Sequence, residues 1–467
     1  MPRGKVKKED KSKDKTAPKE KRERIYTRLR GMKDVLFDEY RYFDLVYNKA
    51  KDLAEFYGFR RLETPLLERA ELYERATGKT TDIVSKEMYV FADKNGDRVA
   101  MRPELTPSMV RAYIEHGMFN LPQPIKMFML GPNFRHEKPQ AGRQRQHHQF
   151  GVEMFGEEKP SADAQVILIA YNFFKELQID VQIQINSIGC KECRAEYEKK
   201  LVEFYNERGK RSKLCLDCKK RIKKNPLRLL DCKELSCVAV RQDAPQIVDF
   251  LCEPCKNHFI KVLEFLDELN VPYHLNPYLV RGLDYYNRTV FEVWPVASEA
   301  PSAEPEEGKA EPDERPGELP RQSALGGGGR YDGLVEYMGG RPTPGLGFGL
   351  GIERTVAKIK EKNIPLKKNG ELVIFIAQLG DASKRKAMVL FEDLRRAGFY
   401  VRQAFTKDSL KVQLEEANRL EAKFALILGQ KEVMDGTILI RDMESGIQEV
   451  IDFNKIKGDL SKRIIEK

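Results

Sequence analysis

Residues 134–155, FRHEKPQAGRQRQHHQFGVEMF, decide the fold of this 467-residue chain. They contain the end of a strand predicted over Ile125 to Arg135, a charged loop, and a second strand predicted over Arg143 to Gly156. Because side chains alternate between the two faces of a strand, residues 147–155 have one polar and one apolar face. The polar face carries Gln149, Gly151, Glu153 and Phe155, and the other face, which we expect to be packed, carries His148, Phe150, Val152 and Met154.

The polar face has the dimensions of a small-molecule site. Gln149 and Glu153 lie about 13 Å apart at ~3.3 Å per residue, and Gly151 places no side chain between them, so an amino acid would fit over the gap. The outer face of an antiparallel sheet in contact with water has the same pattern. The strand alone leaves both interpretations open, and the surrounding sequence favours the site.

Three further features favour a ligand site. An arginine at the end of the partner strand, Arg135, can bind phosphate oxygens in a bidentate way. The segment 279–286, LVRGLDYY, places Arg281 beside two tyrosines. Glycine at every second position predicts a strand with one bare face, a flat floor for a planar or extended ligand, with a glycine-rich turn as the alternative. These glycines are Gly345, Gly347, Gly349 and Gly351.

With these residues in place, the sequence resembles the class II aminoacyl-tRNA synthetases, and specifically the histidyl-tRNA synthetase family. Segment 59–65, FRRLETP, is similar to the family's first motif, whose proline lies at a dimer interface. The hairpin is similar to the second motif and segment 347–354 to the third. Segments 279–286 and 327–333, GGGRYDG, resemble the histidine-specific signatures, and the match covers about residues 25–467.

The resemblance implies an α+β fold. An antiparallel sheet would form the catalytic domain, interrupted by a helical cysteine-rich insert and followed by a C-terminal α/β anticodon-binding domain. Two copies of the chain would form a homodimer. The activity implied is the activation of L-histidine by ATP, with Mg²⁺, and its transfer to histidine tRNA.

Roles for individual residues also follow from the resemblance. The attacking carboxylate is already ionised at pH 7, so the site must supply fixed cations rather than a general base. Arg135 and Arg281 would act on the α-phosphate, and the ATP site would hold Arg135, Glu137, Arg143, His147 and Arg354. The histidine site would hold Glu104, Leu105, Thr106, Gln149, Glu153, Arg281, Tyr285 and Tyr286, with Glu104, Thr106 and Gln149 at the ammonium and Glu153 and Tyr286 at the imidazole. Lys138 and Gln140 would meet the tRNA acceptor stem.

His147 departs from the family pattern, which has an aromatic ring at this position to stack on the adenine. Imidazole is planar and can stack. A protonated ring would repel Arg354, and we therefore expect the affinity for ATP to depend on pH.

All eight cysteines fall within one 66-residue stretch. They form four pairs, and eight thiolates suffice for two tetrahedral zinc sites. Zinc would stabilise an insert for which we expect few large apolar residues. Disulfides, free buried thiols and an iron–sulfur cluster are the alternatives, and the spacing does not say which pairs share an ion. The predicted ligands are Cys190, Cys193, Cys215, Cys218, Cys232, Cys237, Cys252 and Cys255.

Local signals predict several elements. Phe59 to Thr64 reads as a strand, and Thr106 and Pro107 have the residue types of an N-cap and first helical position. The predicted parts are a disordered basic tail at 1–24, the catalytic domain at 25–186 and 257–355 with a disordered loop at 296–322, the cysteine-rich insert at 187–256, a linker at 356–370, and the anticodon-binding domain at 371–467.

The net charge of +10 is concentrated near the N-terminus. Residues 1–30 hold 13 Lys or Arg against 5 Asp or Glu, which fits either a nucleic-acid tether or a solubilising tail. No apolar run approaches the ~20 residues of a membrane helix, and the first residues lack a secretory signal, so we expect a cytoplasmic protein without membrane contact.

Two rival functions remain. The first is a regulatory paralogue that binds histidine without charging RNA, like the regulatory subunit of ATP phosphoribosyltransferase. Such paralogues lack the C-terminal domain and commonly lose the signature arginines, whereas this chain has Arg135, Arg281 and Arg354. The second is an RNA-binding or scaffold protein, which leaves the polar face of Gln149 and Glu153 unexplained.

Overall fold

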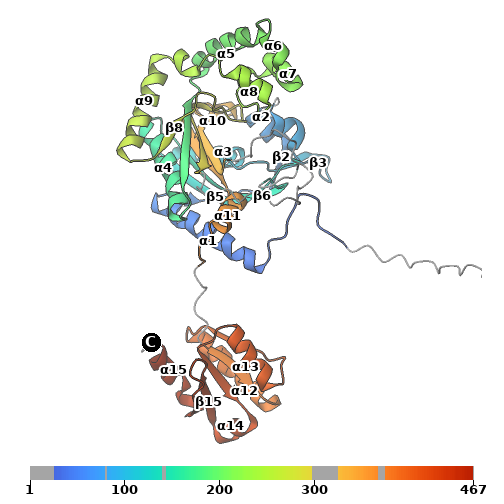
Figure 1. The fold of residues 1–467 in the computed structure, drawn as a ribbon, viewed down its shortest axis with the longest axis vertical. Coiled ribbons are helices and arrows are strands. Elements are labelled where there is room, and N and C mark those ends of the chain that lie inside the picture. The colour runs from blue at the N-terminus through green and yellow to red at the C-terminus, as the bar shows by residue number, and fades with distance from the viewer. Residues whose placement is uncertain (1–25, 79–80, 139–142, 297–323, 367–373, 466–467) are drawn as a thin grey trace, which may run out of the picture. The chain divides into compact units, whose positions relative to one another are not determined.

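The computed structural model describes residues 26–78, 81–138, 143–296, 324–366 and 374–465. The predicted tail, Gln140 and nearly all of the predicted loop at 296–322 lie outside these ranges. The chain forms two compact units, one ending at Ile364 and the other beginning at Pro365 (Figure 1). Among the described residues, no helix is both long and apolar enough to cross a membrane.

The first unit is built on an eight-stranded sheet with the strand order β1-β5-β6-β11-β10-β9-β7-β8. Neighbouring strands are antiparallel except at the two edges, where β1 pairs with β5 and β8 with β7 in parallel. This confirms the predicted antiparallel sheet. The strands are β1 (Arg60–Arg61), β5 (Ile125–Phe134), β6 (Gln146–Phe155), β7 (Val181–Ser187), β8 (Tyr273–Leu275), β9 (Asn287–Pro295), β10 (Gly326–Arg330) and β11 (Gly345–Gly351), beside a smaller sheet of β2 (Leu67–Arg69), β3 (Val90–Ala92) and β4 (Arg98–Met101).

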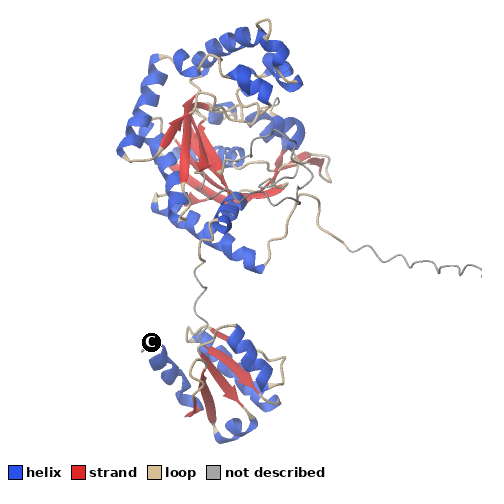
Figure 2. Cartoon of the chain, in the orientation of Figure 1, coloured by secondary structure: helices blue, strands red, loops and turns tan. Residues whose placement is uncertain are grey.

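Helices cover one face of the large sheet (Figure 2). The apolar side chains of β6, Phe150, Val152 and Met154, are buried on this face, as the alternation predicted. They share one core with apolar residues of α1, α4, α9 and α11, and burying each large apolar side chain contributes ~1.5–3 kcal/mol. The opposite face carries the polar side chains Gln149 and Glu153 together with the buried apolar residues Met127, Met129 and Phe155, which belong to a second core. The helices are α1 (Phe37–Phe56), α2 (Ala70–Ala76), α3 (Thr106–Glu115), α4 (Pro160–Glu176), α10 (Leu334–Tyr337) and α11 (Ile352–Glu361), with a π-turn at Ile83–Glu87 and a 3₁₀ turn at Met118–Asn120.

The cysteine-rich insert is helical, as predicted, but it does not lack apolar residues. Tyr197, Leu201, Phe204 and Leu214 are buried in a core that the insert shares with the catalytic part. The expectation that the insert has few large apolar residues was therefore wrong. The insert contains α5 (Lys191–Asn206), α6 (Lys210–Lys213), α7 (Leu216–Lys224), α8 (Leu235–Arg241) and the start of α9 (Glu253–Glu268), with 3₁₀ turns at Pro226–Leu229 and Ile247–Phe250.

The second unit is a five-stranded sheet with the order β13-β12-β14-β15-β16. The first three strands are parallel and the last two antiparallel, which is the mixed α/β sheet that the sequence predicts. Its elements are β12 (Ile374–Gln378), α12 (Asp381–Arg396), β13 (Val401–Gln403), α13 (Leu410–Arg419), β14 (Phe424–Leu428), α14 (Gln430–Asp435), β15 (Thr437–Asp442), β16 (Gln448–Asp452), a 3₁₀ turn at Phe453–Lys455 and α15 (Ile456–Ile465).

Three local predictions need correction. The strand predicted over Phe59 to Thr64 is only two residues long, because it pairs with β5 alone at the edge of the sheet. Thr106 is the first residue of α3 rather than its N-cap, and its hydroxyl bonds elsewhere. The predicted linker starts too early, because Val356 and Ile359 are buried in the core as part of α11.

Candidate functional site

The polar face of β6 lies beside the glycine face of β11. The register pairs Glu153 with Gly347, Gly151 with Gly349, and Gln149 with Gly351. A Cβ at Gly347 would lie 1.8 Å from Glu153 Oε2, whereas a Cβ at Gly349 would first meet the end of Gln149 at 3.4 Å. The predicted strand with one face free of side chains is confirmed. Only at Gly349 and Gly351, however, is there room above this face for a ligand.

The gap predicted between Gln149 and Glu153 is not empty. A Cβ at Gly151 would lie 2.8 Å from Leu105 Cδ1, so the Leu105 side chain lies over the glycine. Leu105 is 3% exposed. The floor between the two polar side chains is therefore apolar.

Glu153 is buried and held by two hydroxyl groups. Thr106 Oγ1 donates to Oε1 at 2.6 Å, and the Tyr331 hydroxyl donates to Oε2. Burial raises the pKa of Glu153 to about 8, although both hydrogen bonds lower it. The structure thus groups Thr106 with Glu153 rather than with Glu104, and it adds Tyr331, which we did not predict as a site residue. Its position in the segment GGGRYDG was the available signal.

Tyr331 follows Arg330, whose ion pair with Asp163 holds this part of the chain in place. The Arg330 side chain is fully buried and donates to both carboxylate oxygens of Asp163 at the start of α4. His258 of α9 contacts the same carboxylate at 3.2 Å. This network fixes the end of β10, and with it the tyrosine that bonds Glu153.

Glu104 is a second buried carboxyl group in the site. It accepts hydrogen bonds from Thr77 Oγ1 at 2.8 Å and from the Tyr285 hydroxyl at 2.7 Å. Burial raises the pKa of Glu104, and the Tyr285 hydrogen bond and the positive charges of Arg135 and Arg281 oppose this rise. The two predicted catalytic arginines therefore act electrostatically on one carboxyl group.

Gln149 is oriented by the opposite strand. Asn133 Nδ2 donates to Gln149 Oε1 at 2.7 Å, which leaves the Gln149 amide nitrogen to face a ligand. Asn133 is fully buried and was not predicted. Tyr285 and Tyr286 lie side by side with their ring centroids 4.7 Å apart, which places Tyr286 next to the tyrosine that bonds Glu104.

The predicted ATP residues gather at the end of the hairpin. Arg135 Nε donates to the Pro103 carbonyl at 2.8 Å, while Glu137 lies 3.3 Å from Arg143 and 3.9 Å from Arg135. Burial and the positive charges of Arg135 and Arg354 lower the pKa of His147 to about 3. His147 is therefore neutral throughout the physiological range, and the pH-dependent repulsion that we expected from it was wrong.

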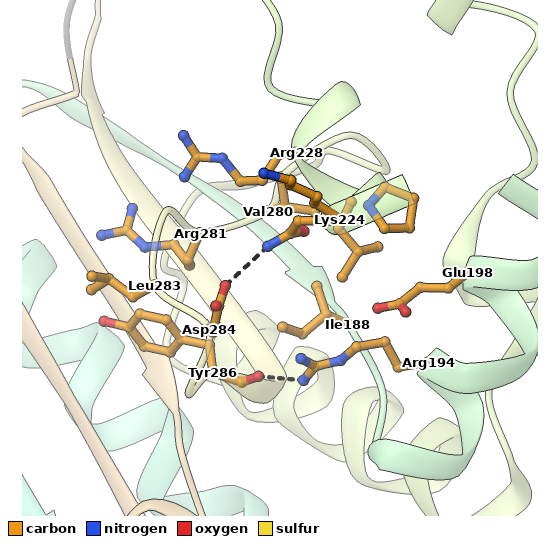
Figure 3. A pocket seen from close by; sticks show the side chains of 13 residues that line it. Ile188, Arg194, Glu198, Lys224, Arg228, Val280, Arg281, Leu283, Asp284 and Tyr286 are labelled. Atoms are coloured by element: carbon orange, nitrogen blue, oxygen red, sulfur yellow. Dashed lines mark hydrogen bonds between the residues drawn. The ribbon is translucent and has the colours of Figure 1, made fainter. Parts of the chain in front are cut away.

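The insert packs against the loop that carries Arg281. Arg281 Nη1 lies 2.6 Å from Glu292 Oε1, and Asn225 Nδ2 of the insert donates to Asp284 at 3.0 Å. Between insert and loop lies a cavity of about 170 Å³, and Lys224, Arg228 and Arg281 are among the residues that line it (Figure 3). The insert thus forms one wall of a cavity beside the loop that carries Arg281.

The eight cysteines form two groups of four. Within each group all sulfur atoms lie within 4.8 Å of one another, and none is in a disulfide. Of the four cysteine pairs in the sequence, the first therefore lies beside the last, and the two middle pairs lie beside each other. The groups are Cys190, Cys193, Cys252 and Cys255, and Cys215, Cys218, Cys232 and Cys237.

Comparison with known proteins identifies the family of the chain. Family models described as Histidyl-tRNA synthetase and as Anticodon binding domain match residues 31–204 and 364–463. A histidine–tRNA ligase of Dehalococcoides mccartyi is 42% identical over 441 residues, covering 94% of this chain and 100% of the relative.

Solved structures extend the comparison. The apo histidyl-tRNA synthetase of S. aureus has a TM-score of 0.73 at 32% identity, covering 92% of this chain and 98% of that chain. An ATP phosphoribosyltransferase regulatory subunit/histidyl-tRNA synthetase of Bacillus halodurans C is 19% identical, with a TM-score of 0.58. The match covers 87% of this chain and 98% of that chain, and at this identity it shows the fold alone. The chain belongs to the histidyl-tRNA synthetase family.

Proposed function

We propose that the chain is a class II histidine–tRNA ligase, which activates L-histidine with ATP and transfers it to the 3′ end of histidine tRNA. The observation that carries this proposal is the pair of buried carboxyl groups, Glu104 and Glu153, set in one site with Arg135 and Arg281. One carboxyl group can bind the ammonium of histidine, and the other can hydrogen-bond its imidazole ring. Two arginines can bind the phosphate that its own carboxylate attacks.

The first step needs charge stabilisation rather than proton transfer. An oxygen of the histidine carboxylate forms a bond to the α-phosphorus of ATP, which enters as its Mg²⁺ complex, while the bond to pyrophosphate breaks. Negative charge on the α-phosphate oxygens falls between Arg135 and Arg281, which Pro103 and Glu292 hold in place. In the second step a ribose hydroxyl of the tRNA attacks the acyl carbon, and AMP leaves.

Recognition of the imidazole rests on Glu153. Its two hydroxyl donors fix the direction of its remaining lone pairs, and Tyr286 lies beside it. A site built to hydrogen-bond a substrate N–H rejects analogues without that N–H by ~10⁴- to 10⁵-fold. Glu104 and Gln149 would bind the ammonium group.

Aminoacylation with radiolabelled histidine tests the function. We expect charging of histidine tRNA by the wild-type chain, and a loss of at least ~100-fold in kcat for Arg135→Lys, because an ammonium cannot replace bidentate phosphate binding. Failure of the wild-type chain to charge this tRNA would overturn the proposal.

We also propose that each cysteine group holds one Zn²⁺. Four sulfur ligands placed tetrahedrally at ~2.3 Å from zinc lie ~3.8 Å from one another. The Cys190 sulfur lies 3.4 Å from the Cys193 sulfur and 3.9 Å from the Cys252 sulfur. Cys215 and Cys232 are also 3.9 Å apart. Because no histidine or carboxylate joins either group among the described residues, zinc would be structural there.

A homodimer in the cytoplasm is part of the same proposal. The segment similar to the family's first motif is followed by exposed apolar side chains at the small sheet, which a second copy would cover. These are Leu66, Leu67, Val90 and Phe91, each 39–48% exposed. Light scattering should give twice the chain mass of 53.9 kDa. For the tRNA, Lys138 and Gln140 remain the proposed contacts with the acceptor stem.

A further inference from the structure

The cysteine-rich insert is hydrogen-bonded to residues 281–286, which we call the Arg281 loop. Arg194 of α5 donates to the Tyr286 carbonyl, and Asn225 Nδ2, at the end of α7, donates to Asp284 Oδ1 at 3.0 Å (Figure 3). Each of these bonds runs from a side chain of the insert to the loop, so the two parts of the chain are held together at two nearby points.

Further contacts with the insert lie near both ends of the Arg281 loop. Arg228 packs against its second residue, because a Cβ at Gly282 would lie 2.7 Å from Arg228 Nη1. Two residues after the loop, the Arg288 amide donates to the Gly189 carbonyl at 2.8 Å, and the Ile188 amide donates to the Arg288 carbonyl at 2.8 Å. The insert therefore supports the backbone of the loop along its length.

Side chains of the same loop belong to the candidate site. The Tyr285 hydroxyl donates to Glu104 at 2.7 Å, and Tyr286 lies beside it with the ring centroids 4.7 Å apart. Arg281 Nη1 lies 2.6 Å from Glu292 Oε1 of β9. A shift of the loop backbone would therefore move one group at the proposed histidine ammonium and one at the proposed phosphate.

We propose that Arg194 and Asn225 are positioning residues for the activation step. They hold the backbone from which Arg281 and Tyr285 extend. Stabilisation of a developing charge requires cations that are fixed before the reaction, and a small misplacement of such a group lowers the rate steeply. The inference rests on the proposed function for the reaction that these residues serve. If the insert only packed against the loop, substitutions there would lower stability and leave the kinetic constants unchanged.

The chain contains its own reporter of this geometry. Trp294 is the single tryptophan of the sequence, and its Nε1 donates to Glu292 Oε2 at 3.1 Å. The other oxygen of this carboxylate is the partner of Arg281. Movement of the Arg281 loop therefore changes the surroundings of Trp294, and its fluorescence measures such movement without any turnover.

The test compares full-length variants. Arg194→Met and Asn225→Ala each remove one bond to the loop, and Arg194→Lys keeps a charged donor. Arg208→Met and Asn206→Ala are matched controls at exposed positions of the same insert. Exchange of labelled pyrophosphate at varied histidine and ATP gives kcat and both KM values. Emission of Trp294 is recorded without substrates, and circular dichroism shows whether each variant folds.

We expect Arg194→Met and Asn225→Ala each to lower kcat about tenfold and to raise the KM for histidine about threefold. The KM for ATP should stay within about twofold of wild type, because Arg135 and Glu137 belong to the hairpin and not to the Arg281 loop. Arg194→Lys should recover part of the lost kcat, since its ammonium can still donate to a carbonyl.

Trp294 emission should change in Arg194→Met and Asn225→Ala and stay as in wild type in both controls. Folded variants with the kcat of wild type would overturn the inference, and so would a lower kcat with unchanged emission or equal losses in the controls. Asn225→Ala removes an exposed hydrogen bond, so it keeps the test available if Arg194→Met does not fold. A wild type that catalyses no exchange would count against the proposed function, and the emission of the variants would still decide the positioning.

Discussion

A methyl group at residue 347 should disable histidine recognition. In Gly347→Ala the new Cβ would lie 1.8 Å from Glu153 Oε2 and 2.2 Å from the Val152 carbonyl, so the Glu153 carboxyl must move away. It would lose its hydrogen bonds from Thr106 and Tyr331.

The size of the effect follows from these contacts. Overpacking costs ~1–3 kcal/mol, and each hydrogen bond lost by a buried polar group costs ~1–3 kcal/mol. A total of at least ~3 kcal/mol corresponds to a fall in kcat/KM for histidine of about 100-fold or more. The KM for ATP should change little, because the atoms nearest to a Cβ at residue 347 belong to Glu153 and Val152 and not to Arg135 or Arg354.

The control is Gly458→Ala in α15, outside the site. Its Cβ would meet no atom within 4 Å, and we expect kcat/KM within about fivefold of wild type. Pyrophosphate exchange at varied histidine measures both variants, and circular dichroism shows whether they fold. If Gly347→Ala is folded and has a wild-type KM for histidine, the assignment of Glu153 is refuted.

Three further predictions concern protonation and metal. The pKa of Glu153 is about 8 in the folded chain and ~4.3 in the unfolded chain, so this residue destabilises the fold increasingly as pH rises between those values. Relative to wild type, Glu153→Gln should therefore gain thermal stability from pH 5 to pH 8. A difference in Tm that stays constant over this range would contradict the prediction. Cys193→Ser and Cys218→Ser should each reduce bound zinc, measured by mass spectrometry, from about two ions per chain to about one, and metal-free wild type with eight titratable thiols would refute both sites. His147→Phe should change the KM for ATP by the same factor at pH 6 and pH 8, because neutral His147 does not titrate in that range. If the ratio of variant to wild-type KM changes with pH, His147 does become protonated and repel Arg354.

Features set by local periodicity could be predicted from the sequence. Alternation along β6 identified its buried and polar faces, and period-two glycines identified β11, because a strand's side-chain directions depend only on neighbouring residues. The helical insert and the alternating strands and helices of the second unit were predictable for the same reason.

Features set by distant residues could not be predicted. Thr106 has the residue type of an N-cap, but Glu153, 47 positions away, takes its hydroxyl. Leu105 covers Gly151, which no local pattern shows. The grouping of the cysteines depends on how α5 and α9 pack together. Cys190 and Cys252 are 62 positions apart in the sequence, but their sulfur atoms lie only 3.9 Å apart.

His147 shows the same limit in electrostatics. Its residue type allowed protonation near neutral pH. Burial beside Arg135 and Arg354, which only the folded chain creates, keeps it neutral.

The most direct test of the central claim is exchange of labelled pyrophosphate into ATP, with each of the twenty amino acids tried as the second substrate. The arrangement of Glu104, Glu153, Arg135 and Arg281 predicts exchange that requires L-histidine and no other amino acid. A chain that binds histidine but catalyses no exchange would be a regulatory paralogue, and that result would contradict the account.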